Sequence, residues 1–186
     1  MKEKALSHLR FQTFFASKET CNSQLADEII GFTQYLDDKK IINEESSGSI
    51  SIGTSSRILI NGEGVNLTRL TKEGIVEVVD YDPVKNIILA VGRIEPCTQT
   101  PVHWMIHRAR CDVHAAAMIR SEKLMGYFEN KDVPVTQREY PPGSFELVKE
   151  VLKTLKTSRI IRVINNGVLI VGISLKEIES VLDNIV

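Results

Sequence analysis

Apolar residues recur at helical spacing in four stretches of this sequence. Along residues 21–38 they fall every three or four positions, which predicts an amphipathic helix whose apolar face contains Leu25, Ile29, Phe32 and Leu36. Residues 99–110 predict a second helix. Ser144 is a typical N-cap for a third helix, and the capping box Ser-Leu-Lys-Glu that begins at Ser174 predicts a last one.

Most of the remaining apolar residues form short runs rich in Val and Ile, which predict strands. We expect strands at 8–16, in the second half of 43–53, and at 57–60, 113–119, 133–138, 159–164 and 168–171. Two further strands are expected to form a hairpin within 71–92. Asn166-Gly167 between the last two is a typical hairpin turn. Hairpins interrupted by helices indicate an α/β fold with a largely antiparallel sheet, and no linker divides the chain, so we expect one domain over residues 1–186.

The composition argues against several classes of protein. Lys and Arg number 23 and Asp and Glu 24, so the formal net charge is -1 and a nucleic-acid partner is not expected. No apolar run approaches the length of a transmembrane helix, and the N-terminus lacks the apolar core of a signal peptide. The three cysteines form no Cys-x-x-Cys pair. We therefore expect a cytoplasmic protein with no membrane partner.

Six short motifs follow one another over about two thirds of the chain, and each is weak alone. They are Gly48-Ser49-Ile50-Ser51, Ile60-Asn61-Gly62-Glu63-Gly64, the run from Pro96 to His103, the run from His107 to Val113, Met118-Ile119-Arg120-Ser121 and Asn165-Asn166-Gly167. In this order and at this spacing they resemble the motifs of the class II aldolase/adducin family, which includes fuculose-1-phosphate aldolase. The resemblance implies a three-layer α/β/α fold with a mostly antiparallel central sheet, and a homotetramer.

The resemblance also implies a zinc site, and the residues for it are absent. Aldolases of this family hold Zn²⁺ with three histidines and use a glutamate as general acid/base. The matching positions here are Met118, Arg120 and Asn166 for the metal ligands and Gln99 for the glutamate. Arginine cannot lose its proton and glutamine has none to give at useful pH, so we expect no metal, no cofactor and no intact catalytic residue.

Two histidines leave room for a replacement site. His103 and His107 lie four residues apart on the helix expected at 99–110, a spacing that can chelate a metal ion. A third ligand is required, and neither a carboxylate nor a cysteine is obviously placed to supply it. We expect both histidines to be structural.

Anion binding is the property that the resemblance implies could survive. The family holds its substrate phosphate with groups that match Ser49, Gly64, Cys97 and Thr98, and Arg120 could add a charge-assisted bond. Glu63 lies in the same loop and would repel phosphate. A small anionic ligand and leftover scaffold loops are both open interpretations.

Three functions remain open at this point. The leading hypothesis is a catalytically inactive aldolase-like protein with a binding, regulatory or structural role. The alternative is a metal-independent or atypical lyase, epimerase or aldolase that acts on a sugar phosphate, in which Arg120 and Gln99 orient the substrate and His103 or His107 supplies the base. The third is a structural subunit that joins an active paralogue.

Overall fold

An eight-stranded sheet forms the centre of the molecule in this computed structural model, which describes residues 10–185. The strands lie in the order β1-β5-β4-β3-β2-β6-β8-β7. Every neighbouring pair is antiparallel except β1 and β5, which are parallel. The strands are β1 Gln12–Ser17, β2 Ser47–Gly53, β3 Ile58–Asn61, β4 Ile75–Asp82, β5 Ile87–Val91, β6 Ala115–Arg120, β7 Ile160–Val163 and β8 Gly167–Gly172.

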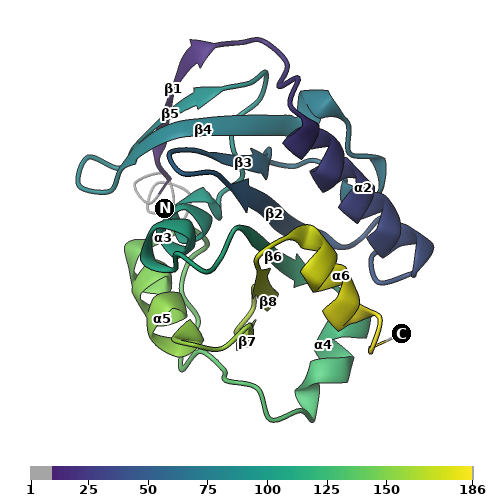
Figure 1. Cartoon of the computed structure of the whole chain (residues 1–186). Coiled ribbons are helices and arrows are strands. Elements are labelled where there is room, and N and C mark those ends of the chain that lie inside the picture. The colour runs from purple at the N-terminus through teal and green to yellow at the C-terminus, as the bar shows by residue number, and fades with distance from the viewer. Residues whose placement is uncertain (1–9, 186) are drawn as a thin grey trace, which may run out of the picture.

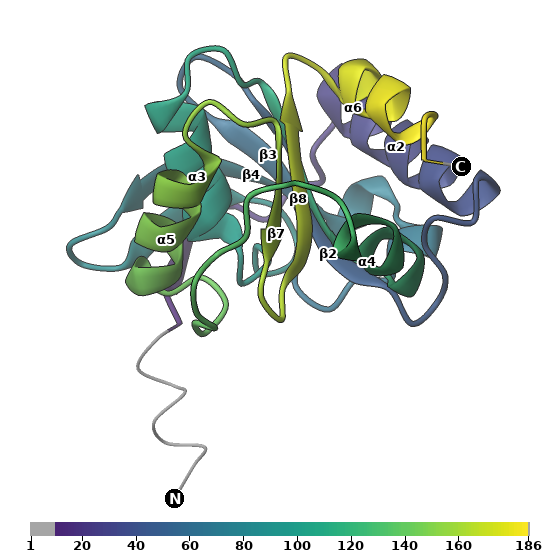
Figure 2. The same ribbon diagram turned by 90° about the horizontal axis from the view of Figure 1, so that it is seen from below.

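Helices cover both faces of this sheet (Figure 1). Helices α2, α4 and α6 pack on one face, and α3 and α5 pack on the other, which is clearest in the view from below in Figure 2. Their bounds are α2 Gln24–Asp38, α3 Thr100–Ala109, α4 Glu122–Glu129, α5 Phe145–Leu155 and α6 Leu175–Leu182. The expected α/β architecture with a mostly antiparallel central sheet is confirmed.

Strand β2 shows how the alternation of side chains divides the core. Ile50 is fully buried against the α2 face, while Ser49 and Ser51 point to the opposite face, where α3 lies. On β6, which pairs with β2, Ala117 faces the α2 side and Met118 faces α3 and α5. Burying an aliphatic side chain of this size contributes about 1.5–3 kcal/mol, so the register of these two central strands is strongly fixed.

Serine side chains begin four of the five helices. The hydroxyls of Ser144 and Ser174 accept hydrogen bonds from backbone N–H groups three residues later, as expected from the sequence. Ser121 caps α4 in the same way. We did not expect α4, because its eight residues carry only two buried side chains and follow directly on a strand.

The strand expected at 133–138 does not form. Only Val135 makes an isolated parallel bridge, to Arg162 of β7. Pro134 has no N–H to contribute to a ladder, and the Thr136 side chain rather than its backbone accepts the bond from the Ile164 N–H. The first strand begins at Gln12 instead of residue 8, and residues 8 and 9 of that expectation lie outside the described residues.

The hairpin between β7 and β8 is also longer than a two-residue turn. Val163 pairs with Gly167, so three residues connect the strands. Positive φ angles occur at Asn165 and Gly167, at 58° and 110°, and not at Asn166. The prediction that Asn166-Gly167 forms the two-residue hairpin turn is therefore wrong, since the usual Asn-Gly turn, type I′, needs positive φ at both of its central residues.

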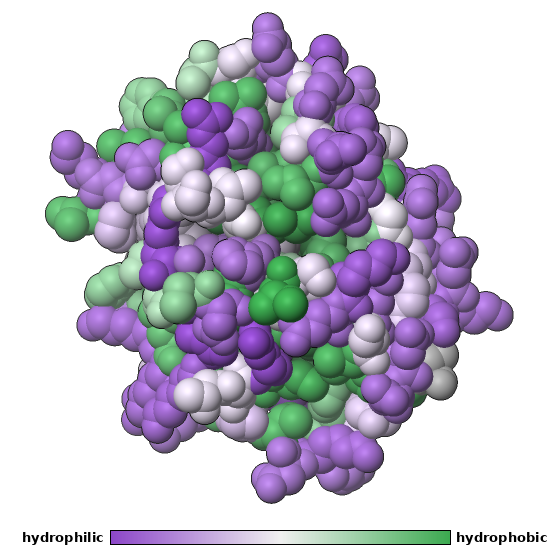
Figure 3. All heavy atoms as spheres, in the orientation of Figure 1, coloured by the Kyte–Doolittle hydropathy of each residue, from purple (hydrophilic) through white to green (hydrophobic). Residues whose placement is uncertain are grey.

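The surface seen in Figure 3 mixes hydrophilic and hydrophobic side chains over the face that Figure 1 shows. Among residues 10–185 we find no helix that combines the length and the apolar character needed to span a membrane.

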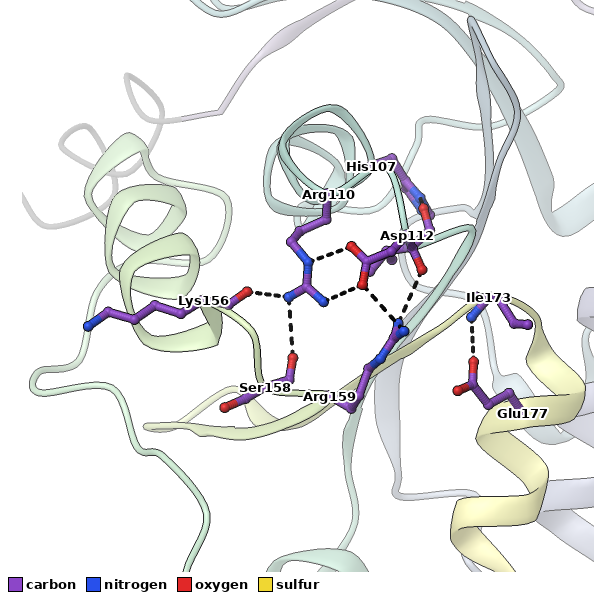
Figure 4. A network of polar contacts seen from close by, with 9 residues as sticks. His107, Arg110, Asp112, Lys156, Ser158, Arg159, Ile173 and Glu177 are labelled. Carbon is purple, nitrogen blue, oxygen red and sulfur yellow. Dashed lines mark hydrogen bonds and ion pairs between the residues drawn. The ribbon is translucent and has the colours of Figure 1, made fainter.

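An ion-pair network joins the end of α3 to the loop between α5 and β7 (Figure 4). The Arg110 guanidinium donates to both carboxylate oxygens of Asp112 at 2.7 Å, and to the backbone carbonyls of Lys156 and Ser158. Arg159 lies 3.3 Å from the same carboxylate. The hydrogen bond from Arg110 lowers the pKa of Asp112 to about 2.

This network predicts a loss of stability in acid. Because the pKa of Asp112 is lower in the folded chain than in the unfolded chain, its contribution is complete above about pH 4 and is lost as the pH falls towards 2. We expect Asp112→Asn to lower the melting temperature at pH 6, and the difference from the wild type to shrink at pH 2.5. Asp132→Asn, which changes an exposed carboxylate, serves as the control. An equal difference at both pH values would contradict the assignment.

Candidate functional site

One cavity of about 310 Å³ collects the residues at the family's metal, acid/base and phosphate positions, while the candidate histidines His103 and His107 lie outside its lining. It lies where the start of β2, the end of β6, the turn between β7 and β8 and two loops meet. Its lining includes Ser49, Gly64, Cys97, Thr98, Gln99, Met118, Arg120 and Asn166. Residues that are up to 117 positions apart in the sequence thus converge, as the resemblance to the family implies.

The two loops of the cavity are held together by their backbones. Gly62 forms an isolated antiparallel bridge with Pro96. The Glu63 N–H donates to the carbonyl of Glu95 at 2.9 Å, and the Cys97 N–H donates to the carbonyl of Asn61 at 3.2 Å. The position of the Glu63 side chain is therefore fixed relative to the start of α3.

Gln99 and Asn166 bond directly to each other across the cavity. The Gln99 Nε2 donates to Asn166 Oδ1 at 2.6 Å, and the Gln99 Oε1 accepts from the Gly143 N–H at 3.3 Å. The Asn166 Nδ2 donates to the carbonyl of Ile164. Gly143 has φ of 70°, and a Cβ there would lie 2.0 Å from the carbonyl oxygen of Thr98, so this close approach requires glycine.

A buried chain of hydrogen bonds runs from the cavity into the core behind it. Ser49 Oγ lies 2.7 Å from His103 Nε2, and Ser51 Oγ lies 2.7 Å from His103 Nδ1. Ser51 Oγ is also 2.8 Å from His107 Nε2, and His107 Nδ1 is 3.3 Å from the carbonyl oxygen of Val113. Ser49, Ser51 and His103 are at most 1% exposed.

The direction of each of these hydrogen bonds follows from the last acceptor, the backbone carbonyl of Val113. The carbonyl of Val113 can only accept, so His107 Nδ1 carries the proton. Burial lowers the pKa of His103 to about 3 and that of His107 to about 4, so both rings are neutral at pH 7. Ser51 therefore donates to His107 and accepts from His103, whose Nε2 accepts the Ser49 hydroxyl hydrogen.

Glu63 occupies the donors at the start of α3. Its Oε2 accepts from the Thr98 N–H and from the Thr98 hydroxyl, both at 2.7 Å. Hydrogen bonds to a carboxylate are about twice as strong as those between neutral groups. The two donors that an external anion would need at this loop are thus taken by the protein's own carboxylate.

The comparisons with known proteins agree with these features. The family model described as "Class II Aldolase and Adducin N-terminal domain" matches residues 27–182. The chain belongs to this family. No curated protein matches it by sequence.

Solved structures of the class II aldolase fold superimpose on the chain. A structure titled "L-fuculose 1-phosphate aldolase" has a TM-score of 0.73 at 17% identity, and the match covers 89% of this chain and 83% of the aldolase chain. YgbL from Escherichia coli, titled a putative aldolase/epimerase/decarboxylase, has a TM-score of 0.71 at 14% identity over 87% and 84%. A fuculose-1-phosphate aldolase from Thermus thermophilus has a TM-score of 0.66 at 19% identity over 86% and 89%. At these identities the likeness shows the fold alone.

The residues present do not fit the zinc ion that the class II aldolase family implies. Met118 is 1% exposed and packs into the apolar cluster beneath α3 and α5. Arg120 is a permanent cation, and the Asn166 amide is bonded to Gln99 and Ile164. Among residues 10–185, no three His, Cys, Asp or Glu side chains come together closely enough to hold a metal ion.

The histidines do not form a replacement site. His103 and His107 lie on the same face of α3, as their spacing predicts, but a serine hydroxyl lies between them and all four ring nitrogens have partners. Neither histidine lines the cavity. The alternative of an atypical lyase needs one of them as a base in the cavity, and that position is not found.

Cys97 and Gly64 line the cavity without offering it a reactive group. Burial raises the pKa of the Cys97 thiol to about 12, so it stays protonated at pH 7. Gly64 has φ of 68° and allows the loop to turn after Glu63. Arg120 is exposed and makes no hydrogen bond or ion pair to the residues that the structure describes.

Two features of the site were not predicted from the sequence: the hydrogen bonds of Ser51 to both histidines and the bonds of Glu63 to Thr98. The signal for Ser51 was present, because Ser-x-Ser on a strand puts two hydroxyls on one face and His-x-x-x-His does the same on a helix. No pattern in the sequence shows that these two faces meet. The contact between Glu63 and Thr98 joins residues 35 positions apart and depends on how the loops pack.

The buried histidines predict a specific pH dependence of stability. Both pKa values are lower than the ordinary 6.5, so the unfolded chain takes up protons first as the pH falls. Stability is complete above pH 6.5 and falls towards pH 4.5, by about 1.4 kcal/mol per pH unit for each histidine. Urea unfolding measured between pH 7.5 and 4.5 tests this.

Matched variants distinguish the contribution of these histidines to the pH dependence of stability from that of other titratable groups. Between pH 6.5 and 5, His103→Gln should reduce the pH dependence of the unfolding free energy by the contribution of one histidine, about 1.4 kcal/mol per pH unit. The exposed His114→Gln should leave most of that dependence in place. Equal slopes in the wild type and in His103→Gln would contradict a neutral buried ring.

Removal of the Glu63 carboxylate should open the loop to anions. In Glu63→Ala the Thr98 N–H and hydroxyl lose their acceptor and a like charge disappears, so we expect inorganic phosphate to bind about tenfold more tightly than to the wild type. Isothermal titration calorimetry with phosphate measures this. Glu95→Ala, in the paired loop, is the control, and equal phosphate affinity in Glu63→Ala and the wild type would contradict the prediction.

Proposed function

We propose that this class II aldolase-like protein has no zinc-dependent aldolase activity and acts as a binding protein that holds a small anionic ligand in the central cavity. The proposal includes a homo-oligomer, a tetramer by resemblance to the family. The role of the protein would then be binding, regulatory or structural. It goes beyond family membership, since the related structures carry the names of aldolases.

The observation that carries the proposal is the hydrogen bond between Gln99 and Asn166. These residues stand at the positions of the family's acid/base glutamate and one of its zinc ligands, and at 2.6 Å they satisfy each other. A substrate or metal ion at this point would have to break that bond and leave a partly buried amide without its partner, at a cost of up to about 1–3 kcal/mol. The two amides therefore connect the loop before α3 to the turn between β7 and β8 across the cavity.

The second support is that Glu63 is the one carboxylate among the described residues that lines the cavity, and its Oε2 is held by two hydrogen bonds from Thr98. Retro-aldol cleavage requires a group that accepts a proton from the substrate hydroxyl and a cation or donor set that stabilises the enediolate. Gln99 cannot titrate, the neutral His103 has both nitrogens engaged, and the Glu63 carboxylate is bonded to Thr98. Arg120 supplies a cation, which suits the binding of an anion better than catalysis.

Metal content and turnover test the proposal directly. We expect the purified protein to contain less than about 0.1 zinc per chain after dialysis, because residues 10–185 bring no three metal ligands together. We also expect it to cleave fuculose 1-phosphate and other ketose phosphates only at background rate with added Zn²⁺, Mn²⁺ or Co²⁺. Sedimentation in the same buffer measures the oligomeric state.

A reconstructed site provides the control for metal binding. The triple variant Met118→His, Arg120→His, Asn166→His places three imidazoles at the family positions, and we expect it to gain zinc affinity over the wild type. Stoichiometric zinc in the wild type, or metal-dependent cleavage well above background, would overturn the proposal.

A further inference from the structure

Several of the polar side chains that line the cavity are satisfied by the protein itself, whereas those of Ser47, Asn165 and Arg120 make no hydrogen bond to the described residues. Asn61 accepts from the Ile50 N–H and donates to the carbonyl of Gly48, and the Gln99 and Asn166 amides are bonded as described above. Thr98 donates to Glu63. A ligand therefore meets only the groups that keep unused hydrogen-bonding capacity, and three of these decide what it can be.

Ser49 offers the cavity a lone pair and no proton. Its hydroxyl hydrogen is donated to His103 Nε2, because the chain of bonds that begins at the Val113 carbonyl fixes every proton along it. The oxygen accepts no hydrogen bond from the described residues. A ligand atom beside Ser49 must therefore be a donor, such as a hydroxyl or an ammonium group.

Glu63 is the second acceptor. Its Oε2 is bonded twice to Thr98, while its Oε1 accepts nothing from the residues that the structure describes. This side of the cavity therefore carries a negative charge and an open acceptor. It favours a donor-bearing group and disfavours a phosphate, because the Glu63 carboxylate and a phosphate carry charges of the same sign.

Arg120 supplies the opposite polarity, and the strand register places it. In the ladder between β2 and β6, Met118 pairs with Ser49 and Arg120 pairs with Ser47. Arg120 and Ser49 are therefore diagonal neighbours on one face of the sheet, with the usual spacing of about 7–8 Å between the Cα atoms of such neighbours. The planar guanidinium has no partner among residues 10–185 and matches the two oxygens of a carboxylate. A single arginine leaves one oxygen of a phosphate without a partner.

From this arrangement we propose that the cavity binds an unphosphorylated small hydroxy- or aminocarboxylic acid, with its carboxylate on Arg120 and its hydroxyl or ammonium donor on Ser49 and Glu63. A cavity of about 310 Å³ is at the small end of ligand sites and suits a molecule of a few carbons. This inference rests on the proposed function, and it names the ligand class of the same site.

Calorimetric titration of the full chain with defined probes tests the inference. Glycerate and serine carry both a carboxylate and a donor, propionate lacks the donor, glycerol lacks the carboxylate, and glycerol 3-phosphate replaces the carboxylate by phosphate. We expect glycerate or serine to bind with a Kd of about 1 mM or tighter, and each of the other three to bind at least about tenfold more weakly.

Matched arginine variants locate the carboxylate. Arg120→Gln, which changes an exposed side chain and should leave the melting temperature unchanged, should weaken glycerate or serine binding about tenfold or more. Arg138→Gln, an exposed arginine that does not line this cavity, should leave it unchanged. Because the comparison of glycerate with propionate needs no mutation, the donor end is tested even if a variant misfolds.

Several outcomes would overturn the inference. These are tighter binding of glycerol 3-phosphate than of glycerate and serine, equal binding of propionate, an equal loss in both arginine variants, or no binding of either probe. None of these results restores metal-dependent cleavage, so a failed ligand assignment is distinguishable from a failed proposed function, which the zinc and turnover measurements decide separately.

Discussion

The neutral ring of His103 is the contact on which the site depends. It lies on α3, and its two nitrogens are bonded to Ser49 and Ser51 of β2, with no exposure to solvent. A buried imidazole without partners would cost about 1–3 kcal/mol for each unsatisfied group, so these bonds fix the rotation and height of α3 over the sheet. The loop from Pro96 to Gln99, which begins α3, is placed by the same contact.

The position of that loop also sets two hydrogen bonds across the cavity. Thr98 and Gln99 both belong to it, and each is bonded across the cavity, Thr98 to Glu63 and Gln99 to Asn166. In both cases a side chain of this protein stands where an external group would bind. The cavity is kept open and polar, but in place of ligands for a metal ion it has an arginine at one end and acceptors at the other.

The fold was predictable to a large extent because periodicity is a local signal. The face of α2 with Ile29 and Phe32, the caps Ser144 and Ser174 and the long hairpin of β4 and β5 all follow from spacing within a few residues. The errors occur where tertiary contacts override that signal. Residues 133–138 look like a strand but run past β7 with one bridge, and α4 is too short for its pattern to stand out.

The sequence by itself determined that Met118, Arg120 and Asn166 are poor ligands for a zinc ion, because the chemistry of a side chain does not depend on packing. That these residues lie together was implied by the resemblance to the family. Only the tertiary structure decided the state of those residues. That Glu63 bonds to Thr98, that His103 is neutral and donates towards the interior, and that Arg120 has no partner among the described residues depend on distances between segments far apart in the chain. Hydrogen bonds act over about 3 Å, and no sequence pattern specifies a three-dimensional contact at that accuracy.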